Sequence, residues 1–184
     1  FTVSIADLDN DGRPDIAATS ASSNSVIVVK NNSTASNLSF NTPLVFNTGQ
    51  YPRSVSVADI NGDGKPDLVT ANNSANSVSV LRNLSSTSNI HFDAPAHYNV
   101  DEHPIHAAVG DLDGDGRPDI VAANSSSDKI SILRNIVGAN IAPVINAFNP
   151  TSAVAGDTVS IAGSNFNNAN SVKFGDIEAT WFSI

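Results

Sequence analysis

The chain has 184 residues and a mass of 19.0 kDa, and its 18 acidic and 9 basic side chains give a formal net charge of −9. Nucleic-acid binding is not expected, because neutralising phosphates requires a basic face that so few cations cannot build. The absence of cysteine excludes disulfides, thiolate metal sites and cysteine nucleophiles. No apolar run approaches the roughly 18 residues that a membrane helix needs, so we expect no membrane insertion by this segment.

The residue composition favours an all-β fold. Ser, Thr and Asn are abundant, β-branched residues recur in short runs, and no window shows an apolar stripe at helical spacing. Short strands about every 10 residues, separated by clusters of Asn, Ser, Gly and Pro, are typical of a sandwich, barrel or propeller. A hydrophobic content of 40%, placed at regular intervals, argues against disorder.

An internal repeat organises the first two thirds of the chain. The acidic segment at residues 7–15 returns at 59–67 and again at 111–119, each time after 52 residues. The apolar positions on both sides of the segment keep the same register without a gap. A coincidental motif would not carry its neighbours with it, so we interpret the pattern as a structural repeat.

Each repeat is predicted to form four strands. In the middle copy, alternating residues predict strands at 54–58 and 78–82, a short apolar run predicts one at 68–71, and a fourth is expected near 91–98. A four-stranded unit of about 50 residues has the size of a propeller blade. Such a unit cannot bury both faces of its sheet alone, so it must stack on neighbours. The prediction for 1–137 is therefore a partial β-propeller of three four-stranded blades.

Each acidic segment reads as a metal-binding loop. Carboxylate or amide oxygens stand at positions 1, 3, 5 and 9, a glycine at position 6 permits the turn between them, and the basic residue at position 7 can offer its backbone carbonyl. Clustered carboxylates repel unless a cation compensates, and hard oxygen ligands at flexible geometry favour Ca²⁺ over Mg²⁺. The predicted ligands of up to three Ca²⁺ ions are Asp7, Asp9, Asp11, Arg13 (backbone carbonyl), Asp15, Asp59, Asn61, Asp63, Lys65 (backbone carbonyl), Asp67, Asp111, Asp113, Asp115, Arg117 (backbone carbonyl) and Asp119.

Two other metal-site types fit these loops poorly. The EF-hand shares the start of the pattern but needs a bidentate Glu at position 12, where this chain has Ala18, Thr70 and Ala122. A zinc site is not expected, because the loops contain no His or Cys. The middle loop has Asn61 where the others have Asp, and this smaller negative charge predicts that it binds Ca²⁺ most weakly.

With these residues the chain resembles FG-GAP/VCBS-type repeats, whose best-known members form the β-propeller of integrin α-chains. The pattern D-x-[DN]-x-D-G-x-P-D lies between two predicted strands, and the resemblance covers about residues 1–137. The literal Phe-Gly and Gly-Ala-Pro signature is absent; its nearest equivalents begin at Phe40 and Phe92, which places the chain nearer the VCBS-like branch. The resemblance implies structural Ca²⁺ in each loop and further blades of the same polypeptide, because three blades cannot close a ring.

The C-terminal stretch has a different character. Residues 143–184 carry the pattern P-x-I-x-x-F-x-P-x-S, then G-x-x-V-x-I-x-G-x-N-F and V-x-F-G. This resembles the N-terminal part of an IPT/TIG domain, which implies a truncated immunoglobulin-like β-sandwich. Residues 138–142 are the expected linker between the two parts.

The function expected from these features is binding rather than catalysis. No nucleophile elbow or phosphate-binding loop is present, so we expect no enzymatic activity in this chain. The resemblance implies a calcium-binding, secreted or cell-surface repeat protein that acts in adhesion or ligand binding, with an extracellular protein or glycan as its unknown partner. The alternative is a non-catalytic accessory or targeting domain of a larger secreted enzyme, such as a polysaccharide-degrading one.

Overall fold

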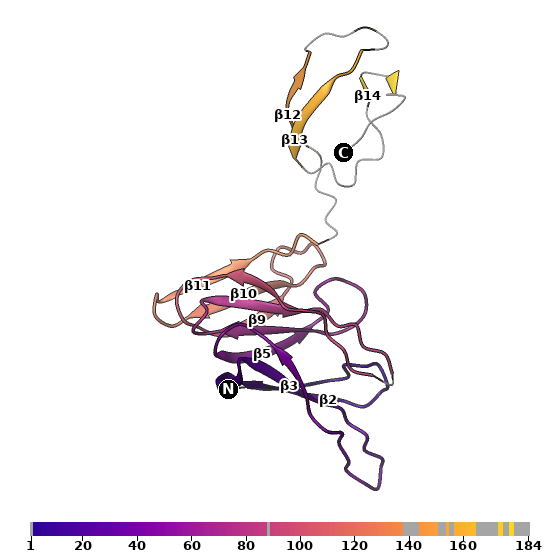
Figure 1. Cartoon of the computed structure of the whole chain (residues 1–184), viewed down its shortest axis with the longest axis vertical. Helices are drawn as coiled ribbons and strands as arrows, with labels where there is room; N and C mark the ends of the chain where they lie inside the picture. Colours follow the sequence, from indigo (N-terminus) through magenta and orange to yellow (C-terminus); the bar gives the residue numbers. More distant parts are fainter. Residues whose placement is uncertain are drawn as a thin grey trace. The chain divides into compact units, whose positions relative to one another are not determined.

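The structure is a computed structural model that describes residues 2–87, 89–137, 144–150, 154, 157–164, 173–174 and 177–178. The chain divides into two compact units, Phe1–Val137 and Gly138–Ile184, and each is described by itself (Figure 1). The predicted linker at 138–142 lies outside the described residues. Within the described part of the chain, no helix is long and apolar enough to cross a membrane.

The first unit is built from three copies of the repeat, which we call repeat 1 (residues 1–49), repeat 2 (50–101) and repeat 3 (102–137). Each copy forms its own antiparallel sheet, with strands in chain order. The all-β prediction is confirmed. The strands are β1 (Val3–Ala6), β2 (Asp15–Ser20), β3 (Ser25–Val29) and β4 (Leu44–Asn47); β5 (Pro52–Ala58), β6 (Asp67–Asn72), β7 (Ser77–Leu81) and β8 (Ala96–Asn99); and β9 (Pro104–Gly110), β10 (Asp119–Asn124) and β11 (Lys129–Leu133).

The third sheet differs from the four-stranded prediction. Its described strands are β9, β10 and β11 only, whereas the sheets of repeats 1 and 2 have four strands each. The 52-residue offset would place its fourth strand at 148–151, but residues 148 and 149 belong to β12 (Val144–Asn149) of the second unit. The sequence no longer follows the 52-residue repeat at these positions, so the described part of the third sheet has one strand fewer than the other two sheets.

The three sheets lie side by side in chain order, from indigo through magenta to orange in Figure 1, and bury two apolar layers between them. Between repeats 1 and 2, Leu8 and Val26 pack with Leu68. Between repeats 2 and 3, Val69 and Val78 pack with residues of the third sheet. Alternation along each strand sends one set of side chains to each face. Repeat 2 is therefore enclosed on both faces.

The second unit contains two short antiparallel pairs. Strand β12 pairs with β13 (Ser160–Ser164), and β14 (Lys173–Phe174) pairs with β15 (Ile177–Glu178). These pairs are consistent with the predicted truncated immunoglobulin-like domain over 143–184.

Candidate metal sites in the acidic loops

Each acidic loop joins the first strand of its sheet to the second, and its shape depends on its own carboxylates. The position-1 aspartates fold back over the loop: Asp7 Oδ2 accepts the N–H of Gly12 at 2.8 Å, and Asp59 and Asp111 accept the equivalent glycine N–H at 2.7 and 2.9 Å. Gly12 has a φ of +83°, in the left-handed region that favours glycine. The predicted turn at position 6 is present in all three loops.

The position-9 aspartates anchor the loops from inside the protein. All three are buried, and each accepts two backbone N–H groups, one from position 2 of its loop and one from an asparagine after the third strand. Burial raises the pKa of Asp15 and Asp67 above the ordinary value. In repeat 3 the N–H of Asn135 outweighs burial and lowers the pKa of Asp119. Each of these aspartates therefore links the second strand, which it begins, to the start of the acidic loop and to the segment after the third strand.

Basic side chains from the end of the third strand meet the carboxylates at positions 3 and 5. The Lys30 ammonium contacts Asp9 and lies 2.7 Å from Asp11 Oδ2, and it lowers the pKa of Asp11. The equivalent side chains are Arg82, 3.5 Å from Asp63, and Arg134, 2.5 Å from Asp113. We did not predict this pairing from the sequence, although the 52-residue offset aligns the three basic residues. Each loop thus has a counter-cation of its own.

The position-7 side chains also have structural partners. Arg13 Nε donates to the Asn31 carbonyl at 3.0 Å, Arg117 Nε donates to the Asn135 carbonyl at 3.1 Å, and Lys65 Nζ donates to Ser85 at 2.9 Å. Their charged ends therefore brace the segment after the third strand. The role of their backbone carbonyls as ligands stays a prediction.

The asparagine after the third strand ties repeats 2 and 3 each to the repeat before it. Asn83 Nδ2 donates to the Pro66 carbonyl of its own loop at 2.7 Å and to the Leu8 carbonyl of repeat 1 at 2.8 Å. Asn135 repeats both bonds with Pro118 and with Ile60 of repeat 2. The sequence shows that an asparagine recurs here, but not that its amide crosses to the preceding loop. The loops are thus coupled from repeat to repeat.

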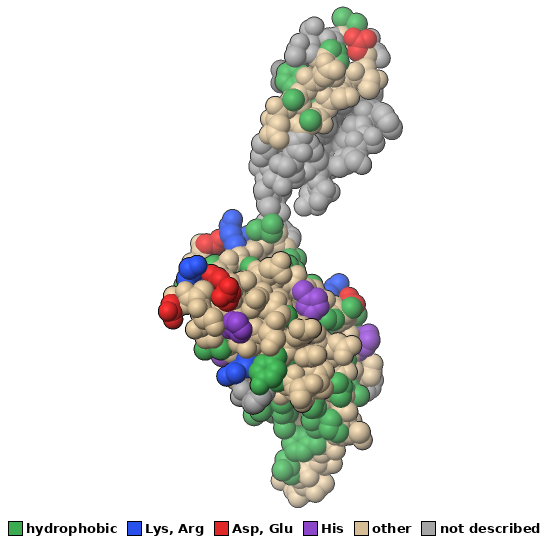
Figure 2. All heavy atoms as spheres, turned by 60° about the vertical axis from the view of Figure 1, so that its left-hand side comes forward, with side chains coloured by type: hydrophobic (Ala, Val, Ile, Leu, Met, Phe, Trp, Pro, Cys, Tyr) green, Lys and Arg blue, Asp and Glu red, His purple; other side chains and the backbone are tan. Residues whose placement is uncertain are grey.

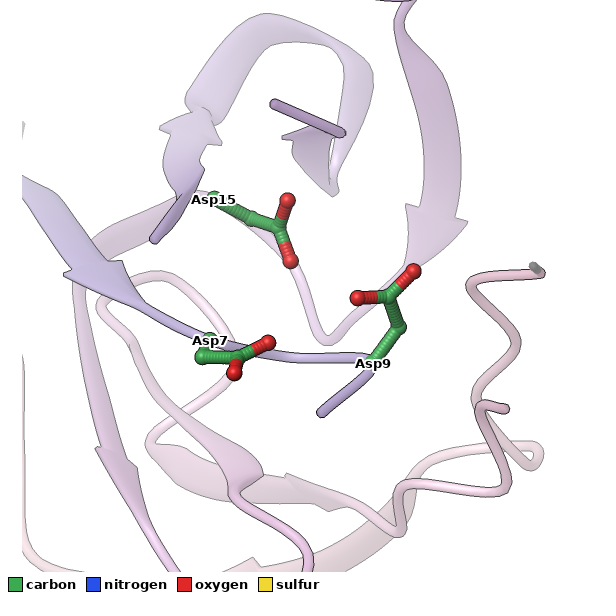
Figure 3. A group of neighbouring side chains, drawn as sticks. All are labelled: Asp7, Asp9 and Asp15. Carbon is green, nitrogen blue, oxygen red and sulfur yellow. The ribbon is translucent and has the colours of Figure 1, made fainter. Parts of the chain in front are cut away.

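Two of the three loops bring carboxylates close enough to share one cation. Oxygens of Asp7, Asp9 and Asp15 lie within 4.8 Å of one another, and Figure 3 shows the three carboxylates directed toward a common space. In the third loop Asp111, Asp113 and Asp115 form a similar but more exposed group. Among the described residues, the middle loop has no such group of three carboxylates. Its Asn61 amide instead donates to Asp63 at 3.1 Å.

The first loop also contains an unsatisfied oxygen. Asp9 Oδ1 is buried and has no hydrogen-bond partner in the described part of the chain, while Lys30 occupies the other oxygen of the same carboxylate. Leaving a buried charged acceptor without a partner is costly. The residues of this loop therefore fit a bound cation beside Asp7, Asp9 and Asp15.

Comparison with known families assigns both parts of the chain. A model of FG-GAP-like repeats matches residues 7–70 and 61–122, a model of the FG-GAP repeat matches 104–141, and a model of the IPT/TIG domain matches 143–184. A search of curated proteins finds no match. FG-GAP and IPT/TIG domains are typical of extracellular proteins and are typically non-catalytic. Because the FG-GAP-like model matches well over half of the chain, the chain belongs to the FG-GAP-like repeat family, with an IPT/TIG domain after its repeats.

Proposed function

We propose that residues 1–137 are a Ca²⁺-stabilised repeat region of a secreted or cell-surface protein that acts in adhesion or ligand binding. The proposal of a bound metal ion rests on one observation: the carboxylates of Asp7, Asp9 and Asp15 converge, and Asp9 Oδ1 among them has no hydrogen-bond partner in the described part of the chain. A hard divalent cation satisfies such an oxygen and offsets the repulsion between the carboxylates.

The chain's own residues explain why an ion here stabilises a blade. Asp7 follows β1, and Asp15 begins β2, so an ion shared between them holds the two ends of the loop. Ca²⁺ supplies charge neutralisation and no chemistry in this proposal. The structural hydrogen bonds of Asp7 and Asp15 orient their carboxylates before any ion arrives. The ligands would be the predicted oxygens of each loop.

A thermal melt tests the metal part directly. After chelation, adding Ca²⁺ at 100 times its dissociation constant stabilises the fold by about 2.7 kcal/mol per site, and Mg²⁺ at the same concentration gives a smaller shift. Asp9→Asn should reduce the Ca²⁺-dependent shift, whereas Asp93→Asn, which changes an exposed carboxylate outside the loops, should leave it unchanged. A melting temperature insensitive to Ca²⁺ would remove the metal from the proposal.

The middle loop should bind Ca²⁺ most weakly of the three. It has Asn61 in place of Asp, and therefore three aspartates where each of the other loops has four. A basic side chain after the third strand meets the carboxylates of every loop, so it does not offset this difference. Calorimetric titration of variants that retain one loop each measures the order. Asn61→Asp should tighten the middle site, while Asn73→Asp, on the same repeat but outside the loop, should not. A middle site that binds tightest would contradict this order.

The binding role is tested separately from the metal. The two families present in the chain support an extracellular binding role, and the proposed partner is a protein or glycan. A screen of the 184-residue chain against glycan and extracellular-protein arrays should give hits that weaken after chelation, because loosened blades present their loops less rigidly. An empty screen in the presence of Ca²⁺ would argue for a structural spacer.

A further inference from the structure

A chain of hydrogen bonds inside the first unit connects the three acidic loops. In repeat 1, Leu8 donates its N–H to Asp15 Oδ2 at 3.0 Å, and its carbonyl accepts the side-chain amide of Asn83 at 2.8 Å. Asn83 in turn donates its backbone N–H to Asp67 Oδ1, in the loop of repeat 2, at 2.7 Å. The position-9 aspartates of two neighbouring loops are therefore joined through two residues.

The same chain of bonds continues into repeat 3. Ile60 donates its N–H to Asp67 Oδ2 at 3.0 Å, and its carbonyl accepts the side-chain amide of Asn135 at 2.7 Å. Asn135 donates its backbone N–H to Asp119 Oδ1 at 2.7 Å. The arrangement thus recurs at the 52-residue offset, and we call its four connecting residues, Leu8, Asn83, Ile60 and Asn135, the asparagine relay.

Most of the relay is shielded from water. Leu8 and Asn83 are at most 1% exposed, as is Asp67, and Asn135 is 8% exposed. Breaking a buried hydrogen bond leaves its polar groups unpaired, which is costly. A change in the position of one member is therefore passed to the next member, because water cannot easily take the place of the lost partner.

We infer that the asparagine relay makes the three loops bind Ca²⁺ cooperatively, so that each filled loop raises the affinity of its neighbour. This inference rests on the proposed function, because it concerns the same candidate sites. Leu8 stands in the chain between two predicted ligands, Asp7 and Asp9, so carboxylates held by an ion also hold Leu8 in place. The Leu8 carbonyl then fixes the side-chain amide of Asn83.

The sign of the coupling follows from the conformational entropy of the loops. A loop must be ordered before its oxygens can share one ion, and this loss of conformational entropy opposes binding. Asn83 contacts the middle loop at two successive residues, Pro66 and Asp67, so a fixed Asn83 orders that part of the loop in advance. The second ion then has less of the loop to order and binds more tightly.

Repulsion between ions in separate loops acts in the opposite direction but more weakly. Basic side chains already lie beside the carboxylates, with Arg82 3.5 Å from Asp63 and Arg134 2.5 Å from Asp113. On the face shown in Figure 2, exposed acidic side chains of the first unit likewise lie next to basic ones. Salt at physiological strength screens exposed charges within about 8 Å, whereas buried hydrogen bonds are screened much less.

The middle loop should depend most on its neighbours. It is joined to the loop of repeat 1 through Asn83 and to the loop of repeat 3 through Asn135. Asn61 gives it one carboxylate fewer than the other loops, so its affinity when the others are empty is the lowest of the three. In the unaltered chain, both neighbours raise this affinity.

A Ca²⁺ titration of the 184-residue chain followed by NMR tests this inference at each loop. Gly12, Gly64 and Gly116 donate their N–H groups to the position-1 aspartates, so their amide signals report the three loops separately. The Gly64 signal of the unaltered chain should respond at a Ca²⁺ concentration at least about fivefold lower than in Asp9→Asn, where the first loop is disabled. Because coupling is reciprocal, Asp59→Asn in the middle loop should weaken the first loop by a similar factor.

Two asparagine variants test whether the relay carries the coupling. In Asn83→Ala the amide between the loops is lost, so the Gly64 response should no longer depend on Asp9→Asn. Asn31→Ala is the matched control: Asn31 makes the equivalent bond to Pro14 of its own loop but does not stand between the first and middle loops, so the coupling should remain.

The outcomes separate this inference from the proposed function. Loops that bind Ca²⁺ independently in the unaltered chain would overturn the inference and leave the proposed sites intact, and so would a coupling that survives in Asn83→Ala. Loops that bind no Ca²⁺ would overturn the proposed function and this inference with it. If Asn83→Ala does not fold, Asn135→Ala combined with Asp111→Asn makes the same test on the link between repeats 2 and 3.

Discussion

In repeat 2, most of strand β7 is buried, because a sheet covers each of its faces. In repeat 3, the equivalent strand β11 leaves Ile130 and Ile132 exposed on the face that points away from repeat 2. The two repeats share the same loop pattern and the same strand register. The difference between them therefore comes from their neighbours and not from their own pattern. Stability in such an array is shared between repeats, and a residue's contribution depends on which sheet lies against it.

The largest expected effect on stability comes from comparing the same leucine in two repeats. Leu8 is 1% exposed between repeats 1 and 2, whereas Leu112, its equivalent in repeat 3, is 57% exposed. Leu8→Ala should lower the free energy of unfolding by about 2–5 kcal/mol, through lost burial and a cavity. Leu112→Ala should change it by no more than about 0.5 kcal/mol. Urea unfolding of both variants, in Ca²⁺, measures the difference.

Similar losses for the two leucines would contradict this comparison. A large loss at Leu112 would show that its side chain is covered in solution. A small loss at Leu8 would show that repeats 1 and 2 do not pack through this residue.

The second effect concerns the asparagine that couples the loops. Asn83→Ala leaves the buried Leu8 carbonyl and the partly buried Pro66 carbonyl without their donor, and should cost about 1–3 kcal/mol. Asn31→Ala removes the equivalent bond to Pro14 on a half-buried residue, where water can replace the amide, and should cost less than about 1 kcal/mol. Chemical unfolding again gives the comparison. Equal costs would mean that the bond to the preceding repeat contributes little.

Much of the fold followed from the 52-residue offset. The acidic loops, the strands on each side of them and the change of character after residue 137 are all local patterns, and local patterns determine strands and turns. The third sheet was expected to have four strands, because the repeat was extended to its full length; the position of its fourth strand belongs to β12 of the second unit. A repeat count alone does not say where the last copy stops.

The acidic loops could be located from the sequence, but the contacts that their side chains make could not. The pattern identified every loop aspartate, yet Lys30 reaches Asp9 from 21 positions along the chain, and Asn83 reaches Leu8 from 75. Such contacts depend on which strand ends meet in the folded sheet. The sequence also treats the position-9 aspartates as three equal ligands, whereas burial raises the pKa of Asp15 and Asp67 and the N–H of Asn135 lowers the pKa of Asp119.

The smallest expected effect is a difference between the pKa values of two of these aspartates, Asp67 and Asp119. Burial raises the pKa of Asp67 above 3.8, and the N–H of Asn135 lowers that of Asp119 below it. As the pH rises from 3.8 through the raised pKa, the folded protein retains a proton that the unfolded chain has lost, so the contribution of Asp67 to stability falls. For Asp119 the stabilising contribution is present above pH 3.8, and is lost as the pH falls through its lowered pKa.

Carboxyl ¹³C shifts followed by NMR against pH, in a chelator to exclude Ca²⁺, measure both pKa values in one sample. Asp67 should titrate above Asp119. The two aspartates occupy the same position of their loops and are both buried, so a difference in this direction reports the additional sheet, that of repeat 3, which packs against repeat 2. An Asp119 that titrates at or above Asp67 would contradict the comparison.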